Sequence, residues 1–496
     1  MPGRAEGEVR PTQRYAHHAT QAYNLRRVLT PIMIRISRIA LIYATSLGAS
    51  IAAFFLIRSL GRSLVSTGAS APVASIKPPA SEAPGILLHV LLALVVIIVV
   101  ARILGALFRR LNLPQVMGEV VAGILLGPSF LGWLAPEVAS RILPVNTAPY
   151  LALLSQVGVV LYMFLVGLDL DTELLQERTQ AAVAISHASI VLPFLSGAAI
   201  ALWLYPRYSA SAVSFTTFAL FIGVAMSITA FPVLARILTD RGIQKTRLGV
   251  LALACAAIND VVAWCLLAFV ISVAHAQTGS LFFTLITTIG FILIVLLIAK
   301  RGALWLVRWQ TAKGRTTQDM FAVVCAALLL SALLTERIGI HALFGAFLLG
   351  TVIPHDSVLA HDIRRKCEDL VVVLLLPVFF VFTGMRTQIG LVHGTRDWLA
   401  CILIIGVASL GKFGVSFLAA QWTGSDWREA ASLGVLMNTR GLMELIVLNV
   451  GLDLGVLSPV LFTMFVIMAV VTTLVTTPIL HQLRDSPPPS PAPAVS

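Results

Sequence analysis

Charged residues are scarce in this sequence: Asp, Glu, Lys and Arg make up 12% of its 496 residues, whereas hydrophobic residues make up 58%. A soluble domain carries about twice that charged fraction, so the composition excludes an ordinary soluble protein. Because backbone polar groups inside a bilayer must be paired within the protein, the long apolar runs predict transmembrane helices. The net charge of +12 does not imply a nucleic-acid partner, because Lys and Arg cluster in short loops, as the positive-inside rule expects.

Cysteine is also rare, and the five residues show no paired spacing (Cys255, Cys265, Cys325, Cys367 and Cys401). Four of them fall within predicted spans, so we interpret them as small apolar residues rather than disulfides or metal ligands. The sequence has no phosphate-binding Gly-rich loop, no zinc-ligand spacing and no G-x-S-x-G motif. We therefore expect no enzymatic activity and no cofactor, and infer that an ion gradient drives any transport.

Hydropathy predicts about fourteen membrane spans. They cover residues 39–57, 86–108, 115–133, 150–168, 181–204, 214–238, 247–274, 281–299, 319–336, 340–354, 370–385, 397–421, 429–451 and 459–481. Residues 1–38 are polar and basic, and the span at 39–57 lies too far into the chain for a cleaved signal, so we expect a retained helix. We expect an extracytoplasmic linker at 58–85 and a disordered Pro-rich tail at 482–496.

Basic residues fall on one side of this predicted topology when the N-terminus is placed inside. The inner clusters are Arg109–Arg110; Arg236, Arg241, Lys245 and Arg247; Lys300, Arg301, Arg308, Lys313 and Arg315; and Arg364, Arg365 and Lys366. The inner loop DLDTELLQER is acidic, but acidic residues count little in this rule. Both termini of this multi-pass membrane protein are therefore predicted to be cytoplasmic.

An internal repeat is visible in two pairs of short segments. VVAGILLGP and LFGAFLLGTVIP each end a span, and the segments MFLVGLDLDT and FFVFTGMRTQ follow them in the same order at nearly the same spacing. The pairs predict two six-span blocks, 86–274 and 319–481, joined by the span at 281–299. The first block begins outside and the second inside, an inverted repeat typical of secondary transporters. The alternative is chance recurrence of Gly-Leu-Leu-Gly strings in apolar sequence.

Two predicted spans contain residues that interrupt a helix. In the first block, Pro232 cannot donate a backbone hydrogen bond, and Ser227 and Thr229 precede it within about one turn. The second block has polar or flexible residues in mid-span: Asn438, Thr439, Arg440 and Gly441. Interrupted spans at matching positions of two repeats predict an ion site at the membrane midplane. The alternative is a Pro kink and a Gly packing contact, both common in membrane helices.

Asn259 and Asp260 lie near the middle of the span ALACAAINDVVAWCLLAFVIS, where a charge costs roughly 2.5–3.5 kcal/mol on insertion scales. Asp260 could be a structural carboxylate paired with Lys412 or Arg440, a protonated hydrogen-bonding group, or an exchange site. As an exchange site it would hold either a proton or a small cation, which couples the two fluxes, because desolvation favours its neutral form. Asn259 would add an amide oxygen, since hard cations prefer oxygen ligands.

Other polar residues in the spans have two interpretations each. Lys412 lies near the middle of its span, and we expect it to neutralise the acidic site or a broken helix end rather than to snorkel. Arg440 and Glu444 are four residues apart and are predicted to face each other on one helix, as a structural ion pair or part of a gate. Glu119, one turn inside its span, is expected to be structural. His341 is expected to be a hydrogen-bonded structural residue, with a pH sensor as the alternative.

Eight motifs in order resemble those of the monovalent cation:proton antiporters: LPQVMGEVVAGILLGPSFLG, FLVGLDLD, SITAFPVLARIL, AAINDVVAW, GIHALFGAFLLG, PVFFVFTGM, GKFG and MNTRGLMELIVLNVGLDLGVLS. The resemblance covers residues 86–482, and is strongest to the branch of plant and fungal cation/proton exchangers and bacterial Na+/H+ or K+/H+ antiporters. It implies an all-α membrane fold with two inverted six-helix repeats and two crossing interrupted helices. It also implies a homodimer in which a dimerising panel (86–170 and 319–386) supports a mobile core (181–274 and 396–481).

The resemblance also assigns residues. The family's ion-binding aspartate corresponds to Asp260 and its polar neighbour to Asn259. The first crossing helix corresponds to Thr229 and its surroundings, the second to 438–441, and the family's core lysine to Lys412. The core is expected to move like an elevator against the panel, while H+ and Na+ or K+ compete at Asp260.

The sequence departs from the family in two ways. Electrogenic relatives carry two adjacent acids where this chain has Asn259 and Asp260, so we predict electroneutral exchange of one proton for one cation. This leaves Lys412 without its usual acidic partner. The span at 39–57 is additional, and we expect no attached nucleotide-binding regulatory domain. The alternatives to antiport are a sodium-coupled solute symporter of the same fold, a gated cation channel and a non-transporting sensor or scaffold.

Overall fold

The computed structural model describes residues 43–66, 85–169, 179–210, 213–244, 246–275, 281–338 and 341–485, and the regular structure in these ranges is helical throughout. The chain divides into two units, 1–59 and 60–496. The first contains nearly all of an apolar helix of 19 residues, Tyr43–Gly61, which corresponds to the additional N-terminal span. The predicted polar segment 1–38 and most of the predicted linker, acidic loop and Pro-rich tail lie outside the described residues.

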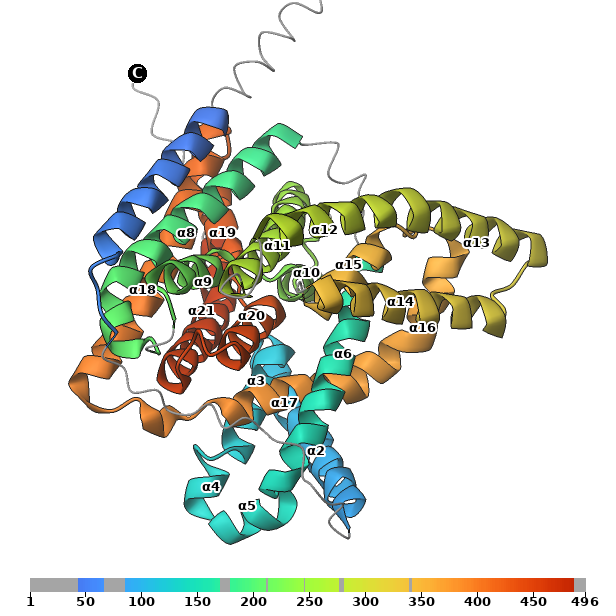
Figure 1. Ribbon diagram of the computed structural model, residues 1–496, viewed down its shortest axis with the longest axis horizontal. Coiled ribbons are helices and arrows are strands. Elements are labelled where there is room, and N and C mark those ends of the chain that lie inside the picture. The colour runs from blue at the N-terminus through green and yellow to red at the C-terminus, as the bar shows by residue number, and fades with distance from the viewer. Residues whose placement is uncertain are drawn as a thin grey trace, which may run out of the picture. The chain divides into compact units, whose positions relative to one another are not determined.

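The helices of the second unit form a bundle (Figure 1). They are α2 (Ile86–Arg110), α3 (Gln115–Leu126), α4 (Leu131–Leu134), α5 (Pro136–Ile142), α6 (Ala148–Leu168), α8 (Thr179–Tyr208), α9 (Phe215–Ser227), α10 (Phe231–Asp240), α11 (Arg247–His275), α12 (Leu281–Ile294), α13 (Lys300–Lys313), α14 (Gln318–Ile338), α15 (Ala342–Thr351), α16 (Val358–Leu370), α17 (Leu376–Arg386), α18 (Gly394–Trp422), α19 (Trp427–Met437), α20 (Leu442–Asp453) and α21 (Pro459–Asp485). Short π-helical segments, Val295–Ala299 and Val371–Leu375, join α12 to α13 and α16 to α17.

The helical stretches agree with the predicted spans. Within the described residues, thirteen are long and apolar enough to cross a bilayer, and α15 is a shorter apolar helix. That shorter helix lies within the predicted span at 340–354, which is itself short. The chain is therefore an all-helical, multi-pass membrane protein, as the apolar runs predicted.

The bundle contains two groups of helices, defined by which helices pack together. In the first helix group, α17 packs against α3 and α6, α2 covers α3, and α15 lies between α6 and α14. In the second helix group, α8 packs against α9, α11 and α18, while α19 and α20 pack against α21, and α10 lies on α11. The two groups meet at few places, among them α3 with α21 and α17 with α20.

Glycines of the repeated motifs form equivalent contacts in the two blocks. A Cβ atom added to Gly167 of α6 would lie 2.3 Å from the Phe347 carbonyl oxygen of α15. A Cβ atom added to Gly384 of α17 would lie 2.4 Å from the Val120 carbonyl oxygen of α3. Small residues allow such close approach of membrane helices. The glycine of each FLVGLDLD-like motif thus contacts a helix of the other block, which supports a repeat rather than chance recurrence.

Both predicted helix interruptions are present. The first lies between α9 and α10, at 228–230, and Pro232 occupies the first turn of α10, where its missing N–H is harmless. The second lies at 438–441, between α19 and α20. The two breaks meet, because the Ala230 N–H donates to the Thr439 carbonyl oxygen at 3.0 Å. Four helix ends therefore face one another inside the second helix group.

Candidate functional site

Asp260 lies in the middle of α11 and is buried beside the crossing, with 3% of its surface exposed. Neither carboxylate oxygen has a hydrogen bond of ordinary geometry. The N–H of Phe231, the first residue of α10, faces the carboxylate, and helix N-termini carry partial positive charge. Lys412 and Arg440 form their contacts elsewhere, so the structure does not support the interpretation of Asp260 as one half of a structural ion pair.

Asn259 supplies a second type of buried oxygen one residue before Asp260 on α11. Its Nδ2 donates to Ser189 Oγ at 3.0 Å and to Thr229 Oγ1 at 3.3 Å, so the amide is oriented from two sides. Its Oδ1 has no hydrogen-bond partner and is buried. The amide and carboxylate together supply oxygen atoms of the kind that hard cations prefer. Sequence reasoning missed Ser189, although Ser186 and Ser189 lie three residues apart within the predicted span 181–204.

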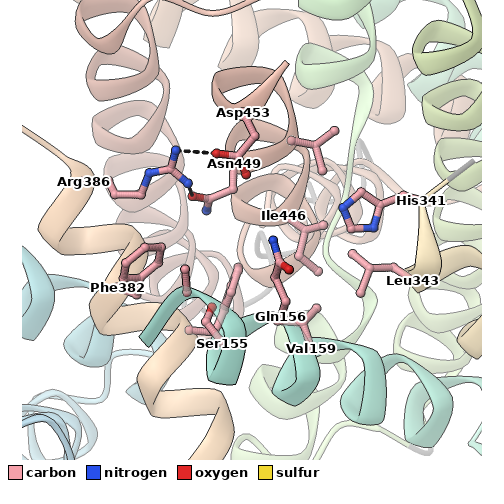
Figure 2. A pocket seen from close by; sticks show the side chains of 13 residues that line it. Ser155, Gln156, Val159, His341, Leu343, Phe382, Arg386, Ile446, Asn449 and Asp453 are labelled. Carbon is pink, nitrogen blue, oxygen red and sulfur yellow. Dashed lines mark hydrogen bonds and ion pairs between the residues drawn. The ribbon is translucent and has the colours of Figure 1, made fainter. Parts of the chain in front are cut away.

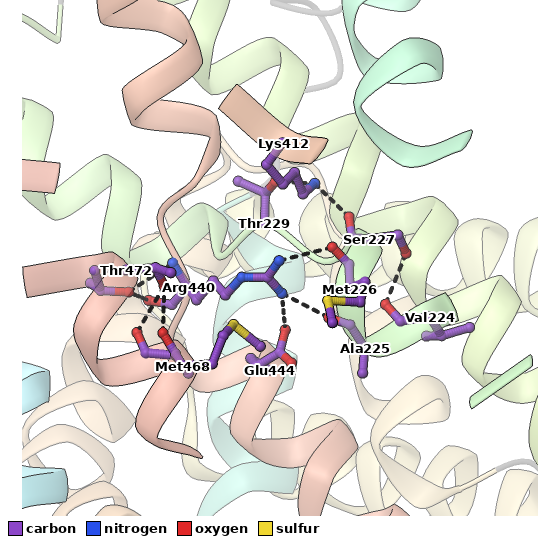
Figure 3. A network of polar contacts seen from close by, with 12 residues as sticks. Val224, Ala225, Met226, Ser227, Thr229, Lys412, Arg440, Glu444, Met468 and Thr472 are labelled. Atoms are coloured by element: carbon purple, nitrogen blue, oxygen red, sulfur yellow. Dashed lines mark hydrogen bonds and ion pairs between the residues drawn. The ribbon is translucent and has the colours of Figure 1, made fainter. Parts of the chain in front are cut away.

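Lys412 of α18 is completely buried and lies at the C-terminal end of α9 (Figure 3). Its Nζ donates to the Ser227 carbonyl oxygen and to Thr229 Oγ1, the latter at 2.7 Å. Carbonyl groups at a helix C-terminus carry partial negative charge, which the ammonium group neutralises. The Ser227 hydroxyl donates to the Val224 carbonyl oxygen at 2.9 Å, so it is committed to its own helix. Lys412 thus contacts a broken helix end, through a carbonyl group instead of an acid.

Arg440 is completely buried and caps the same helix end (Figure 3). Its Nη1 donates to the Ala225 carbonyl oxygen at 2.7 Å and to Glu444 Oε2 at 2.8 Å, and its Nη2 donates to the Met226 carbonyl oxygen at 2.9 Å. The prediction that Arg440 and Glu444 share one helix was wrong, because Arg440 lies in the break before α20. The extended break lets the guanidinium reach α9 while Glu444 neutralises it, which favours the structural ion pair.

The remaining residues of the second break surround the crossing. The Asn438 Nδ2 lies 3.5 Å from Ser409 Oγ, while Asn438 Oδ1 and Thr439 Oγ1 are buried without a hydrogen-bond partner. Gly441 lies against α10, where an added Cβ would be 2.5 Å from Val233 Cγ2. The residues predicted at the two interrupted spans are therefore brought together.

A cavity of about 250 Å³ lies between the two helix groups near the start of α10. Its lining includes Pro232 and Val233, and the N–H of the preceding residue, Phe231, faces Asp260. Glu119 of α3 also lines it, with Gln115 Nε2 donating to Glu119 Oε1 at 3.2 Å. Four further lining residues are charged: Asp169, Arg236, Arg364 and Glu368. Glu119, which the sequence suggested to be structural, therefore lines this cavity.

A second cavity, of about 570 Å³, lies between α6, α17 and α20 (Figure 2). His341 lines it, and the buried Nδ1 of this residue has no hydrogen-bond partner, so the expected structural hydrogen bond is absent at that nitrogen. Arg386, Asn449 and Asp453 form a polar cluster in its wall. Sequence reasoning missed this cluster, whose only signal is polar residues near the ends of two apolar segments.

Comparisons with known proteins agree with these features. Residues 94–483 match the profile of the transmembrane sodium/hydrogen exchanger family. The Na+/H+ antiporter NhaS4 of Synechocystis sp. is 44% identical over 405 residues, which are 81% of this chain and 98% of the relative. Cation/H+ antiporter 17 of Arabidopsis thaliana is 36% identical over 76% of this chain and 46% of its own length. K+/H+ antiporter 1 of Saccharomyces cerevisiae is 33% identical over 75% of this chain and 43% of its own length.

The chain thus spans less than half the length of the plant and yeast relatives, but nearly all of NhaS4. Among solved structures, the sodium proton antiporter MjNhaP1 of Methanocaldococcus jannaschii superimposes with a TM-score of 0.60 at 16% identity, covering 80% of this chain and 96% of that one. This similarity shows the fold, and the sequence comparisons show the family. The chain belongs to the sodium/hydrogen exchanger family.

Proposed function

We propose that this protein is a secondary antiporter that exchanges a monovalent cation, Na+ or K+, for H+ across a membrane. The observation that carries the proposal is the buried carboxylate of Asp260, whose two oxygens have no ordinary hydrogen bond and lie beside two broken helices. The names of the relatives support exchange rather than sodium-coupled symport or a gated channel.

The chemistry at Asp260 is competition between two ligands. A deprotonated carboxylate attracts a cation, and the start of α10 faces the carboxylate and stabilises its charge. The buried Asn259 Oδ1 is a further oxygen that the bound cation can use as a ligand. A protonated carboxylate is neutral, so its oxygens no longer attract the cation. Because the neighbouring position is Asn259 and not a second acid, one proton leaves for each cation bound. The exchange is therefore electroneutral, with a ratio of 1:1.

Alternating access requires that Asp260 be reached from each side in turn. The cavity near α10 contains Arg236 and Arg364, which the positive-inside rule places at the cytoplasmic side. The cavity between α6, α17 and α20 lies at the other ends of these helices, toward the predicted outer side. The first helix group acts as the dimerising panel of a homodimer and the second as the moving core. The protein resides in a bacterial inner membrane with both termini in the cytoplasm.

The test is proton flux in proteoliposomes that contain an internal pH dye. Addition of Na+ or K+ should change the internal pH with wild-type protein, and Asp260→Asn should abolish that change. Glu137→Gln, which alters an exposed carboxylate on α5, is the matched control and should transport normally. Folding of each variant is checked by size-exclusion chromatography.

Clamping the membrane voltage tests the stoichiometry separately. A rate that ignores voltage supports 1:1 exchange, whereas strong voltage dependence would refute the ratio and spare antiport. Cation-driven pH change that persists in Asp260→Asn would refute the proposed site. Cation flux without any pH change in the wild-type protein would favour a channel instead.

A further inference from the structure

Arg386, at the C-terminal end of α17, connects the two helix groups across the wall of the larger cavity (Figure 2). Its Nη1 donates to Asn449 Oδ1 of α20 at 2.9 Å, and its Nη2 forms an ion pair with the Asp453 carboxylate. Asn449 in turn donates from Nδ2 to Thr383 Oγ1 of α17 at 2.8 Å. Three polar contacts therefore join one short stretch of α17 to the last turns of α20.

The position of these contacts matters because the helix groups otherwise meet at few places. At the opposite end of α20, Leu442 and Glu119 of α3 both line the smaller cavity. The helix α20 is thus joined to the first helix group by polar contacts at its C-terminal end and borders a cavity that it shares with that group near its N-terminal end.

Two other ion pairs act within the second helix group. Arg207 pairs with Asp397, which joins α8 to α18, and Arg247 pairs with Glu429, which joins α11 to α19. The Arg386 cluster differs because it joins α17 of the first helix group to α20 of the second. These helices must separate or slide if Asp260 is to be reached from the opposite side of the membrane. The hydrogen bond between Arg386 and Asn449 is also well shielded from solvent, since Asn449 is only 9% exposed. A shielded hydrogen bond to a guanidinium group contributes more than an exposed ion pair.

We propose that Arg386, Asn449 and Asp453 form a latch that favours the conformation described here and must open once in each transport cycle. The latch closes the route between α17 and α20 while the cavity near α10 remains in place. This inference rests on the proposed alternating access, because a latch matters only if the two helix groups move relative to each other. A purely structural role would leave the balance between conformations unchanged when the contacts are removed.

The test compares chemical access to the two cavities in detergent-solubilised protein, where both sides are exposed to reagent. In a chain whose five native cysteines are replaced by alanine, a single cysteine is introduced by Val233→Cys in the smaller cavity or Ile446→Cys in the larger one. The rates of modification by a maleimide are then measured. Arg386→Gln should raise the ratio of the Ile446→Cys rate to the Val233→Cys rate by roughly tenfold, as expected for loss of a hydrogen bond to a charged group.

Two more variants make the result decisive. Asp453→Asn should shift the ratio in the same direction, and the double variant should add less than the sum of the two single effects, because both remove the same latch. Arg207→Gln, which breaks an ion pair within one helix group, is the matched control and should leave the ratio unchanged. An unchanged ratio in Arg386→Gln and Asp453→Asn, or an equal shift in Arg207→Gln, would overturn the latch.

The labelling experiment needs no ion gradient, so it is independent of the transport assay. A shifted labelling ratio together with normal transport by Asp260→Asn would retain the latch and reject the proposed ion site. Loss of transport in Asp260→Asn with unchanged labelling ratios would retain the ion site and reject the latch.

Discussion

Replacing Arg440 by methionine should destabilise the protein more than any exposed arginine substitution. The change leaves the Glu444 carboxylate buried without a partner, and it removes the donors from the Ala225 and Met226 carbonyl groups. Breaking a buried ion pair by removing one partner costs about 3–5 kcal/mol. Each orphaned carbonyl group adds a further cost of about 1–3 kcal/mol where it remains unpaired.

The pair can be dissected by a double-mutant cycle. Glu444→Met leaves a buried guanidinium that keeps two carbonyl acceptors, and should also be strongly destabilising. The double variant Arg440→Met/Glu444→Met removes both charges, so it should recover part of the loss, but not all of it, because the α9 carbonyl groups stay without donors. The expected order of stability is wild type, then the double variant, then Arg440→Met.

The assay is thermal unfolding of purified protein in detergent. For a chain of 496 residues the entropy of unfolding is on the order of 1 kcal/mol per kelvin, so the ion-pair cost of about 3–5 kcal/mol alone lowers Tm by about 3–5 °C. Carbonyl groups that stay unpaired lower Tm further. Arg207→Met is the control, because the Arg207 side chain is 47% exposed and its ion pair with Asp397 spans 3.5 Å. Its Tm should fall by about 1 °C or less. An equal drop for both arginines, or a double variant less stable than Arg440→Met, would refute the reasoning.

Three further outcomes follow from the site and the packing. Asn259→Asp adds a second buried acid beside Asp260, so exchange should become voltage-dependent, measured by flux at clamped potentials; voltage independence would show that the added acid does not titrate in the cycle. Because protons and cations compete for Asp260, the cation concentration for half-maximal exchange should rise as pH falls, by up to about tenfold per pH unit, and an unchanged value would contradict competition. Gly123→Ala places a Cβ 2.2 Å from the Val381 carbonyl oxygen and should lower Tm, whereas Gly290→Ala, with nothing within 4 Å, should not.

The membrane spans were predictable because bilayer thickness fixes their length and excludes charge from most positions. The interruption near Pro232 was also readable, since proline cannot continue a hydrogen-bonded helix from its preceding turn. The second break was also readable from the polar and flexible residues at 438–441. What the sequence did not indicate is that Arg440 lies in this break, outside the helix of Glu444, where its guanidinium has acceptors on α9.

Contacts between residues far apart in the chain could not be predicted from the sequence pattern. Lys412 and Ser227 are 185 residues apart, and nothing in their local composition indicates that an ammonium group and a backbone carbonyl group meet. Arg386 and Asn449 are 63 residues apart, and their contact cannot be predicted before the packing of α17 on α20 is known. Local chemistry identified Asp260 and Asn259, because a polar pair inside an apolar span is costly without a role. The groups that orient them required the fold.

The Thr229 hydroxyl makes every contact that a hydroxyl group has available: it donates to the Met437 carbonyl oxygen, and it accepts from Asn259 and Lys412. A cation could use this oxygen only by displacing one of the two incoming donors. If the ammonium group is the one displaced, arrival of a cation at Thr229 moves a positive charge away from the end of α9. Occupancy of the site would then be transmitted to α18 through one shared oxygen atom, without any shift of the helix backbone.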